Sequence, residues 1–228
     1  MTTSVRDIAQ RLAAVEERLV AACTRAGRRR TDVTLVAVSK LQPPAAIEAA
    51  VEAGATTFGE NYVQELRSKQ DALTTLDVAW HFIGSLQRNK AKDLVGRVAL
   101  IHSVDSLALA EAISRRAAGV DATVDILLEV NAAGELTKGG VRADAVARLV
   151  DQVRALPALR CRGLMTMPPP ADDAAASRPH FRGLAALART LDLPELSMGM
   201  TGDFEVAVEE GATIVRVGTA IFGARPPR

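Results

Sequence analysis

The sequence predicts an α/β fold: a single (β/α)8 barrel of the TIM type, preceded by one extra helix. Eight short apolar runs recur along the 228 residues, and each is followed by a stretch with helical periodicity. No Gly-x-Gly-x-x-Gly segment follows the first run, so an open doubly wound sheet is the less favoured alternative. No shift in composition marks a boundary. We therefore expect one domain, with a helix and basic turn at residues 1–30 and the barrel at residues 34–223.

The elements are expected in a regular order. Residues 5–19 place apolar side chains three or four positions apart, which is typical of an amphipathic helix, and Gly27 is its expected stop. Strands are expected at residues 34–38, 55–58, 80–83, 98–102, 124–130, 160–166, 195–198 and 213–217. Helices are expected at residues 45–53, 62–73, 87–95, 107–118, 143–155, within 174–191 and at 204–210.

The composition argues against several classes of protein. The 28 basic residues balance 27 acidic ones, so neither nucleic acid nor a membrane surface is an expected partner. Cys23 and Cys161 have no zinc-site spacing, and neither do the histidines, so no metal is expected. The chain has no signal-peptide core and no run near the roughly 20 apolar residues of a membrane helix. We expect a cytoplasmic protein.

Small and polar residues gather where the strands are expected to end. They occupy residues 39–40, 59–61, 84–85, 102–103, 131, 165–166, 197–199 and 216–219. In a (β/α)8 barrel the carboxyl ends of the strands carry the active site. Because such residues would be out of place in the packed layers of the barrel, we interpret this ring as a functional site.

Lys40 follows the first apolar run directly, so its side chain begins at the barrel mouth. Partial desolvation there would favour the neutral amine, which attacks carbonyl groups. The alternative is a lysine that extends into solvent. Position alone does not separate these two interpretations.

The seventh and eighth runs end in loops suited to an anion. Barrel phosphate sites are often built from the loops after these strands, and here Arg216, Gly218 and Thr219 end the eighth run. Thr201, after the seventh, is expected to cap the next helix, whose acidic first turn must point away from a phosphate. A lysine opposite a phosphate site suggests a Schiff-base aldolase or a pyridoxal phosphate protein.

The chain from residue 36 to residue 225 resembles the pyridoxal phosphate homeostasis proteins. The matching segments are AVSK (37–40), FGENYVQE (58–65), WHFIG (80–84), LQRNK (86–90), RGLM (162–165), LSMGM (196–200) and RVGTAIFG (216–223). The resemblance implies a barrel similar to the N-terminal domain of alanine racemase, with pyridoxal 5'-phosphate bound to Lys40 as a Schiff base. It implies that Ser197, Gly218 and Thr219 hold the phosphate. It also implies that Arg216 faces the pyridine nitrogen and that Asn61 lies near the ring.

The function implied is vitamin B6 homeostasis without robust catalysis, with apo forms of pyridoxal phosphate enzymes as partners. A charged Arg216 disfavours protonation of the ring nitrogen, which weakens the cofactor as an electron sink. Racemisation needs a second acid/base, but Tyr62 is the only tyrosine and the chain ends at Arg228, soon after the eighth run. A monomer is favoured. The alternative function is a weak amino-acid racemase or lyase.

Three further features carry weaker expectations. Leu41 stands where the family more often has a polar residue, which could alter access to Lys40. Residues 131–140, which include Lys138, resemble a long family loop and are interpreted as a flexible lid. Lys69, Lys90 and Lys92 are interpreted as solvated helix lysines, with a transient second cofactor site as the alternative.

Overall fold

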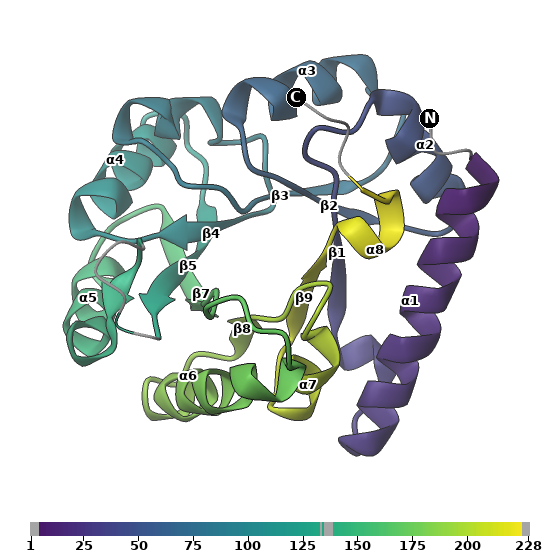
Figure 1. The fold of residues 1–228 in the computed structure, drawn as a ribbon. Coiled ribbons are helices and arrows are strands. Elements are labelled where there is room, and N and C mark those ends of the chain that lie inside the picture. Colours follow the sequence, from purple (N-terminus) through teal and green to yellow (C-terminus); the bar gives the residue numbers. More distant parts are fainter. Residues whose placement is uncertain (1–4, 133, 135–138, 225–228) are drawn as a thin grey trace.

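The computed structural model describes residues 5–132, 134 and 139–224, and these form a closed barrel of parallel strands (Figure 1). The barrel strands are β1 (Thr34–Val38), β2 (Thr57–Glu60), β3 (Ala79–Phe82), β4 (Leu100–Val104), β5 (Val124–Asn131), β7 (Leu159–Met165), β8 (Glu195–Ser197) and β9 (Ile214–Val217). Each strand pairs with the next, and the pairing of β9 with β1 closes the ring. The predicted fold class is confirmed.

Helices follow the strands and surround them (Figure 1). They are α1 (Val5–Arg25), α2 (Pro44–Glu52), α3 (Val63–Ala72), α4 (Leu107–Ala118), α5 (Val146–Arg154), α6 (Arg178–Thr190), α7 (Phe204–Glu209) and α8 (Thr219–Phe222). Shorter 3-10 segments are η1 (Arg30–Asp32), η2 (Arg88–Asp93), η3 (Ala143–Ala145) and η4 (Ala174–Ser177). The helix expected at residues 87–95 is therefore a 3-10 helix.

Several strands and turns differ from the sequence expectation. The second and fourth strands begin and end two residues later than expected, so both include residues that the sequence places at the barrel mouth. His102 consequently lies within β4 and is fully buried. The short strand β6 (Val141–Arg142), which pairs with β5 outside the ring, and α8 were not predicted.

The first helix packs on the outside of the barrel. Ile8, Leu12, Val15 and Leu19 form its buried stripe, whereas Val5 is exposed. Gly27 has a φ of +64°, the left-handed conformation that commonly ends a helix. Helix α1 contacts α2, α7 and α8, which are the helices that follow β1, β8 and β9 (Figure 1).

The apolar core has two parts. The larger part lies between the barrel and its helices, where Ala, Val, Leu and Ile predominate. A smaller cluster, which consists of Val36, Leu100, Leu127, Met165 and Ile214, fills the barrel interior because alternate residues of each strand point inward. Gly59 also faces inward, and a Cβ there would lie 2.8 Å from Val36 Cγ1. The interior is thus closely packed below the mouth.

Within the described residues, no helix combines the length and the apolar character needed to cross a membrane. In the same part of the chain, no three His, Cys, Asp or Glu side chains converge in a way that could hold a metal ion. Cys23 and Cys161 are both free thiols.

Candidate functional site

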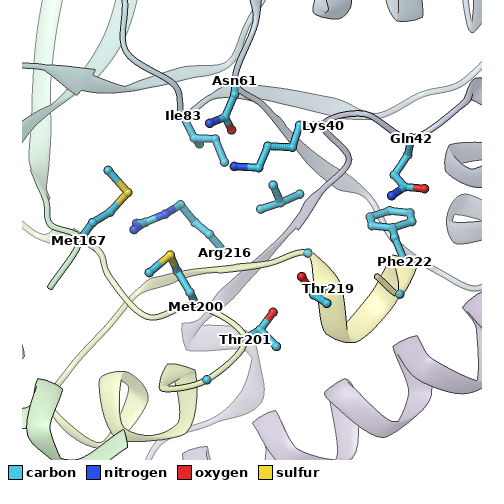
Figure 2. Close-up of a pocket in the computed structure, with 14 residues that line it drawn as sticks. Lys40, Gln42, Asn61, Ile83, Met167, Met200, Thr201, Arg216, Thr219 and Phe222 are labelled. Carbon is cyan, nitrogen blue, oxygen red and sulfur yellow. The ribbon is translucent and has the colours of Figure 1, made fainter. Parts of the chain in front are cut away.

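A cavity of about 230 Å³ opens at the carboxyl ends of the barrel strands (Figure 2). Its described lining residues are Val38, Lys40, Gln42, Asn61, Ile83, Met167, Met200, Thr201, Gly202, Arg216, Gly218, Thr219, Phe222 and Gly223. Five of the six residues that the resemblance assigns to the cofactor lie in this set, and Ser197 does not. The cavity therefore brings together the two ends of the barrel sequence, from Val38 to Gly223.

Lys40 enters the cavity from the loop after β1. Its side chain is half-buried, and in Figure 2 its amino end points toward the side chains of Asn61 and Ile83. The interpretation of Lys40 as a lysine that leaves the mouth for solvent does not fit this placement. The next residue, Leu41, has a φ of +63°, so the chain turns sharply directly after the lysine.

Two loops face Lys40 and offer groups that suit an anion. Gly218 and Thr219 follow β9, and Thr201 and Gly202 follow β8. The hydroxyl groups of the two threonines lie near one another on one side of the cavity (Figure 2). Hydroxyl and backbone N–H donors from the loops after the seventh and eighth barrel strands are a common phosphate site in this fold.

The expectation that Thr201 caps helix α7 is wrong. Asp203 is the N-cap residue of α7, and its Oδ1 accepts a hydrogen bond from Met200 N at 2.7 Å. Its Oδ2 accepts another from Ser177 Oγ at 2.8 Å, and Glu205 pairs with Arg18 at 2.9 Å. Both acids of this first turn are thus engaged outside the cavity, and Thr201 is available to a ligand.

Asn61 provides a direct test of whether the cavity suits a polar ligand. Its Oδ1 atom is buried and has no hydrogen-bond partner among the described residues. A buried amide oxygen without a partner is energetically costly, so a ligand donor or water would stabilise it. Gly84 packs directly under this residue, because a Cβ at Gly84 would lie 2.1 Å from Asn61 O. The close approach fixes the position of the asparagine.

Arg216 lies at the base of the cavity. It belongs to β9, is only 4% exposed, and donates through NH2 to Thr166 O at 3.0 Å. Its NH1 donates to Ser197 Oγ. Burial lowers the pKa of Arg216 to about 10, which still leaves the guanidinium charged at neutral pH. Glu129 provides part of the opposing negative charge.

Ser197 lies below the cavity and contacts Arg216 instead of lining the site. Its side chain is fully buried, and its Oγ also lies 2.8 Å from His102 Nδ1. His102 Nε2 lies 2.9 Å from His81 Nδ1, so a chain of hydrogen bonds descends through the barrel interior. Burial lowers the pKa of His81 to about 4 and that of His102 well below its ordinary value. Both rings are neutral at pH 7.

One arrangement of protons satisfies this whole chain. An arginine only donates, so Ser197 Oγ accepts from Arg216, and in this arrangement the serine hydroxyl donates its own proton to His102 Nδ1. His102 then donates through Nε2 to His81 Nδ1. The sequence placed His102 and Ser197 in the ring at the mouth; both instead support Arg216 from beneath.

The lysines outside the cavity differ from one another. Lys69 is buried at 4% exposure and is not a solvated helix lysine, so that interpretation is wrong for this residue. Lys92 is exposed, and Lys90 is half-buried beside Tyr62 in a separate hollow. Lys138 lies outside the described residues.

Sequence reasoning missed several residues of the cavity. Gln42 and Met167 line it although the sequence assigns them no role. Met200, Thr201 and Gly202 lie in the loop after the seventh strand, which the sequence predicts to suit an anion, although Thr201 is expected there to cap a helix.

The cavity combines one lysine, one buried arginine, an asparagine with an unsatisfied oxygen, and hydroxyl donors from two loops. Comparisons with known proteins identify the family. The family model described as "Alanine racemase, N-terminal domain" matches residues 11–226. The "Pyridoxal phosphate homeostasis protein" of Aquifex aeolicus is 47% identical over 222 residues, covering 95% of this chain and 97% of the relative.

Solved structures with similar sequences share this fold. A structure titled as an unknown protein from Bifidobacterium adolescentis has a TM-score of 0.91 and 38% identity, covering 96% of this chain and 95% of its own. PipY of Synechococcus elongatus, solved with pyridoxal phosphate bound, has a TM-score of 0.81 and 39% identity. The match covers 95% of this chain and 100% of the PipY chain. The barrel, the cavity and the identity over nearly the full length lead to one conclusion: the chain belongs to the pyridoxal phosphate homeostasis protein family.

Proposed function

We propose that this protein holds pyridoxal 5'-phosphate on Lys40 as a Schiff base and serves in vitamin B6 homeostasis without robust catalysis. The observation that carries the proposal is that Lys40 enters the same cavity as the two threonine loops and Arg216 (Figure 2). A solved relative at 39% identity, PipY, has pyridoxal phosphate bound.

Each part of the cavity has a proposed role. Lys40 Nζ attacks the aldehyde carbon; a C=N bond forms and one water molecule leaves. Thr201 and Thr219, with the backbone of Gly202 and Gly218, hold the phosphate. When bound, the cofactor supplies an electron sink whose strength depends on the protonation of its ring nitrogen.

The polar lining explains why turnover would be weak. Among the described residues of the lining, Lys40 and Arg216 are the two with ionisable side chains. Arg216 stays charged at neutral pH, so it donates to a ring nitrogen and cannot act as a base. Racemisation requires an acid/base on each face of the substrate, and Tyr62 does not belong to this lining. Ser197, to which the resemblance gives a phosphate contact, is proposed instead to orient Arg216.

The test is covalent loading of the purified protein. Incubation with pyridoxal 5'-phosphate should produce a visible absorbance band that Lys40→Ala abolishes, while Lys40→Ala still binds pyridoxine 5'-phosphate, which has no aldehyde. Lys92→Ala, at an exposed lysine of η2, should load normally. A wild-type protein without the band would overturn the proposal. Borohydride trapping of a sugar phosphate on Lys40 without cofactor would instead indicate the Schiff-base aldolase.

The alternative of a weak racemase or lyase rests on the fold shared with the N-terminal domain of alanine racemase. It predicts exchange of an amino acid's α-proton in deuterated water at a rate well above that of free cofactor. Under our proposal, the loaded protein and free cofactor differ little in this assay.

We further propose that the loaded protein, a single-domain monomer in the cytoplasm, delivers the cofactor to apo-enzymes. A transfer assay tests this. Reactivation of an apo-enzyme by the loaded protein should be faster than reactivation by free cofactor at equal concentration, and equal or slower rates would contradict delivery.

A further inference from the structure

A buried cluster of charged side chains lies beside Lys40 but outside the cavity. At its centre is Lys69 of α3, whose ammonium group donates to Ser39 O at 2.6 Å, Glu60 Oε1 at 2.7 Å and Glu65 Oε1 at 2.6 Å. These three hydrogen bonds use all the protons that an ammonium group carries. A lysine buried to this extent persists only when it is paired in this way.

The cluster holds the residue before Lys40. Ser39 is fully buried, and its carbonyl oxygen accepts the bond from Lys69. Its hydroxyl group donates to Glu60 Oε1 at 2.6 Å. Glu60, at the end of β2, is itself 0% exposed. The backbone and the side chain of Ser39 are therefore both fixed by buried charges.

The cluster also holds the residue after Lys40. Leu41 N donates to Glu65 Oε1 at 2.5 Å, and the same oxygen accepts the bond from Lys69. Leu41 has a φ of +63°, which a residue with a side chain rarely adopts unless its surroundings enforce it. The hydrogen bond that Leu41 N donates to Glu65 is such a constraint. The two peptide groups that flank Lys40 thus meet in one cluster.

We propose that Lys69, Glu60 and Glu65 are positioning residues that fix the backbone at residues 39–41 and thereby direct the Lys40 amine into the cavity. The proposal rests on the proposed function of Lys40. None of the three belongs to the described lining of the cavity, so they act through the backbone and not by touching a ligand. Leu41 released from Glu65 would relax toward an ordinary φ, and that rotation would redirect the adjoining lysine.

Glu65 offers the sharpest test, because its side chain is 20% exposed and its replacement need not disrupt the core. Glu65→Ala removes the acceptor for Leu41 N, and Glu65→Gln retains an oxygen there. The matched control is Glu111→Ala, which removes an i,i+4 partner of Arg115 on α4 and lies outside the cavity lining. A second variant, Glu60→Gln/Lys69→Met, removes two opposite buried charges together, so that neither is left unpaired.

Two measurements on the full-length protein separate positioning from general damage. The first is the rate at which pyridoxal 5'-phosphate becomes covalently attached, followed by visible absorbance. The second is the dissociation constant of pyridoxine 5'-phosphate, which binds without Lys40 chemistry. Glu65→Ala and the double variant should slow attachment by about ten- to a hundredfold, the order of effect of a small misplacement of a reacting group. The dissociation constant should stay within about twofold, because the ligand contacts are intact.

A cofactor-free measurement completes the test. The Leu41 amide should exchange with deuterium faster in Glu65→Ala than in the wild type, and Glu65→Gln should restore both this protection and the attachment rate in large part. Unchanged attachment rates in Glu65→Ala and the double variant would overturn the inference, as would an equal loss of both attachment rate and pyridoxine 5'-phosphate affinity. A wild-type protein that never attaches the cofactor would overturn the proposed function itself.

Discussion

His102 Nδ1 lies 2.8 Å from Ser197 Oγ in the barrel interior, and this contact continues the hydrogen bond that Ser197 accepts from Arg216. The arginine at the base of the cavity is therefore held by a chain of neutral groups. Its guanidinium is fixed before a ligand arrives, which reduces the entropy lost on binding.

Ser197→Ala should weaken cofactor binding by leaving Arg216 without one partner. We expect the dissociation constants of pyridoxal 5'-phosphate and pyridoxal to rise by a similar factor of about ten, the worth of a hydrogen bond to a charged group. The control is Ser114→Ala, which removes a buried hydroxyl that donates to Pro157 O at 2.6 Å. It should lower the melting temperature without changing affinity. If the affinity falls for pyridoxal 5'-phosphate but not for pyridoxal, Ser197 contacts the phosphate instead.

The two histidines should make the protein less stable as the pH falls. Burial lowers the pKa of His81 from 6.5 to about 4, so between these values the unfolded chain binds a proton that the folded chain does not. The free energy of unfolding then falls with decreasing pH by up to about 1.4 kcal/mol per pH unit from His81. Urea unfolding at pH 7, 6 and 5 measures this dependence.

His81→Gln isolates that contribution. Burial raises the pKa of Glu60 and of Glu129, and these groups act with the opposite sign, so the informative quantity is the difference between wild type and variant. His81→Gln should show a shallower loss of stability on acidification than the wild type. If the free energy of unfolding depends on pH in the same way for the wild type and for His81→Gln, the lowered pKa of His81 does not contribute to acid destabilisation, and the prediction is wrong.

Thr201→Val and Thr219→Val should each weaken phosphate recognition. Each substitution keeps the size of the side chain and removes the hydroxyl donor, so the dissociation constant of pyridoxine 5'-phosphate should rise about tenfold. Binding of pyridoxine, which has no phosphate, should not change. Thr190→Val removes an exposed hydroxyl that donates to Leu187 O at 2.7 Å and serves as the control. Isothermal titration calorimetry would measure both ligands, and equal losses for both would count against a phosphate contact.

Gly84→Ala should destabilise the protein and disturb Asn61. The new Cβ would lie 2.1 Å from Asn61 O, so the backbone must move, at a cost of about 1–3 kcal/mol. Gly183→Ala is the matched control, because a Cβ there meets nothing within 4 Å in the helix α6. It should stabilise the helix by roughly 0.5–1 kcal/mol. Chemical denaturation measures the free energy of unfolding, which should fall in Gly84→Ala and rise in Gly183→Ala.

The sequence was sufficient for the barrel and for most of the cavity. Its apolar runs are separated by helical stretches, and in parallel barrels the polar strand ends meet at one mouth, which brings Lys40, Asn61, Arg216, Gly218 and Thr219 together. The sequence did not show how deep in the barrel a polar side chain at a strand end lies. His102 and Ser197 follow apolar residues as mouth residues do, and only the register of β4 and the contact with Arg216 place them in the interior.

Lys69 shows a second reason for error. Lysines on helices are mostly solvated, and its burial depends on Glu60, which is nine residues earlier in the sequence. A signal was present, since Lys69 stands three residues after Leu66 and four before Leu73, both of them buried. That spacing places it on the apolar face of α3. A charged residue on such a face indicates that a buried partner exists.

Helix α1 connects the outer surface of the barrel to the elements that carry the cavity. It contacts the helices that follow three of the loops that line the cavity, those after β1, β8 and β9, and Arg28, just beyond α1, donates to the carbonyl oxygens of Val208 and Ala212 at 3.0 and 2.7 Å. A change that weakens the packing of α1 therefore also weakens the packing of the helices next to the cavity loops, although α1 contributes no residue to the described lining. By thermodynamic reciprocity, a ligand that tightens those loops must also hold α1 more firmly against the barrel. The N-terminal helix would then report on cofactor occupancy from the outer surface of the molecule.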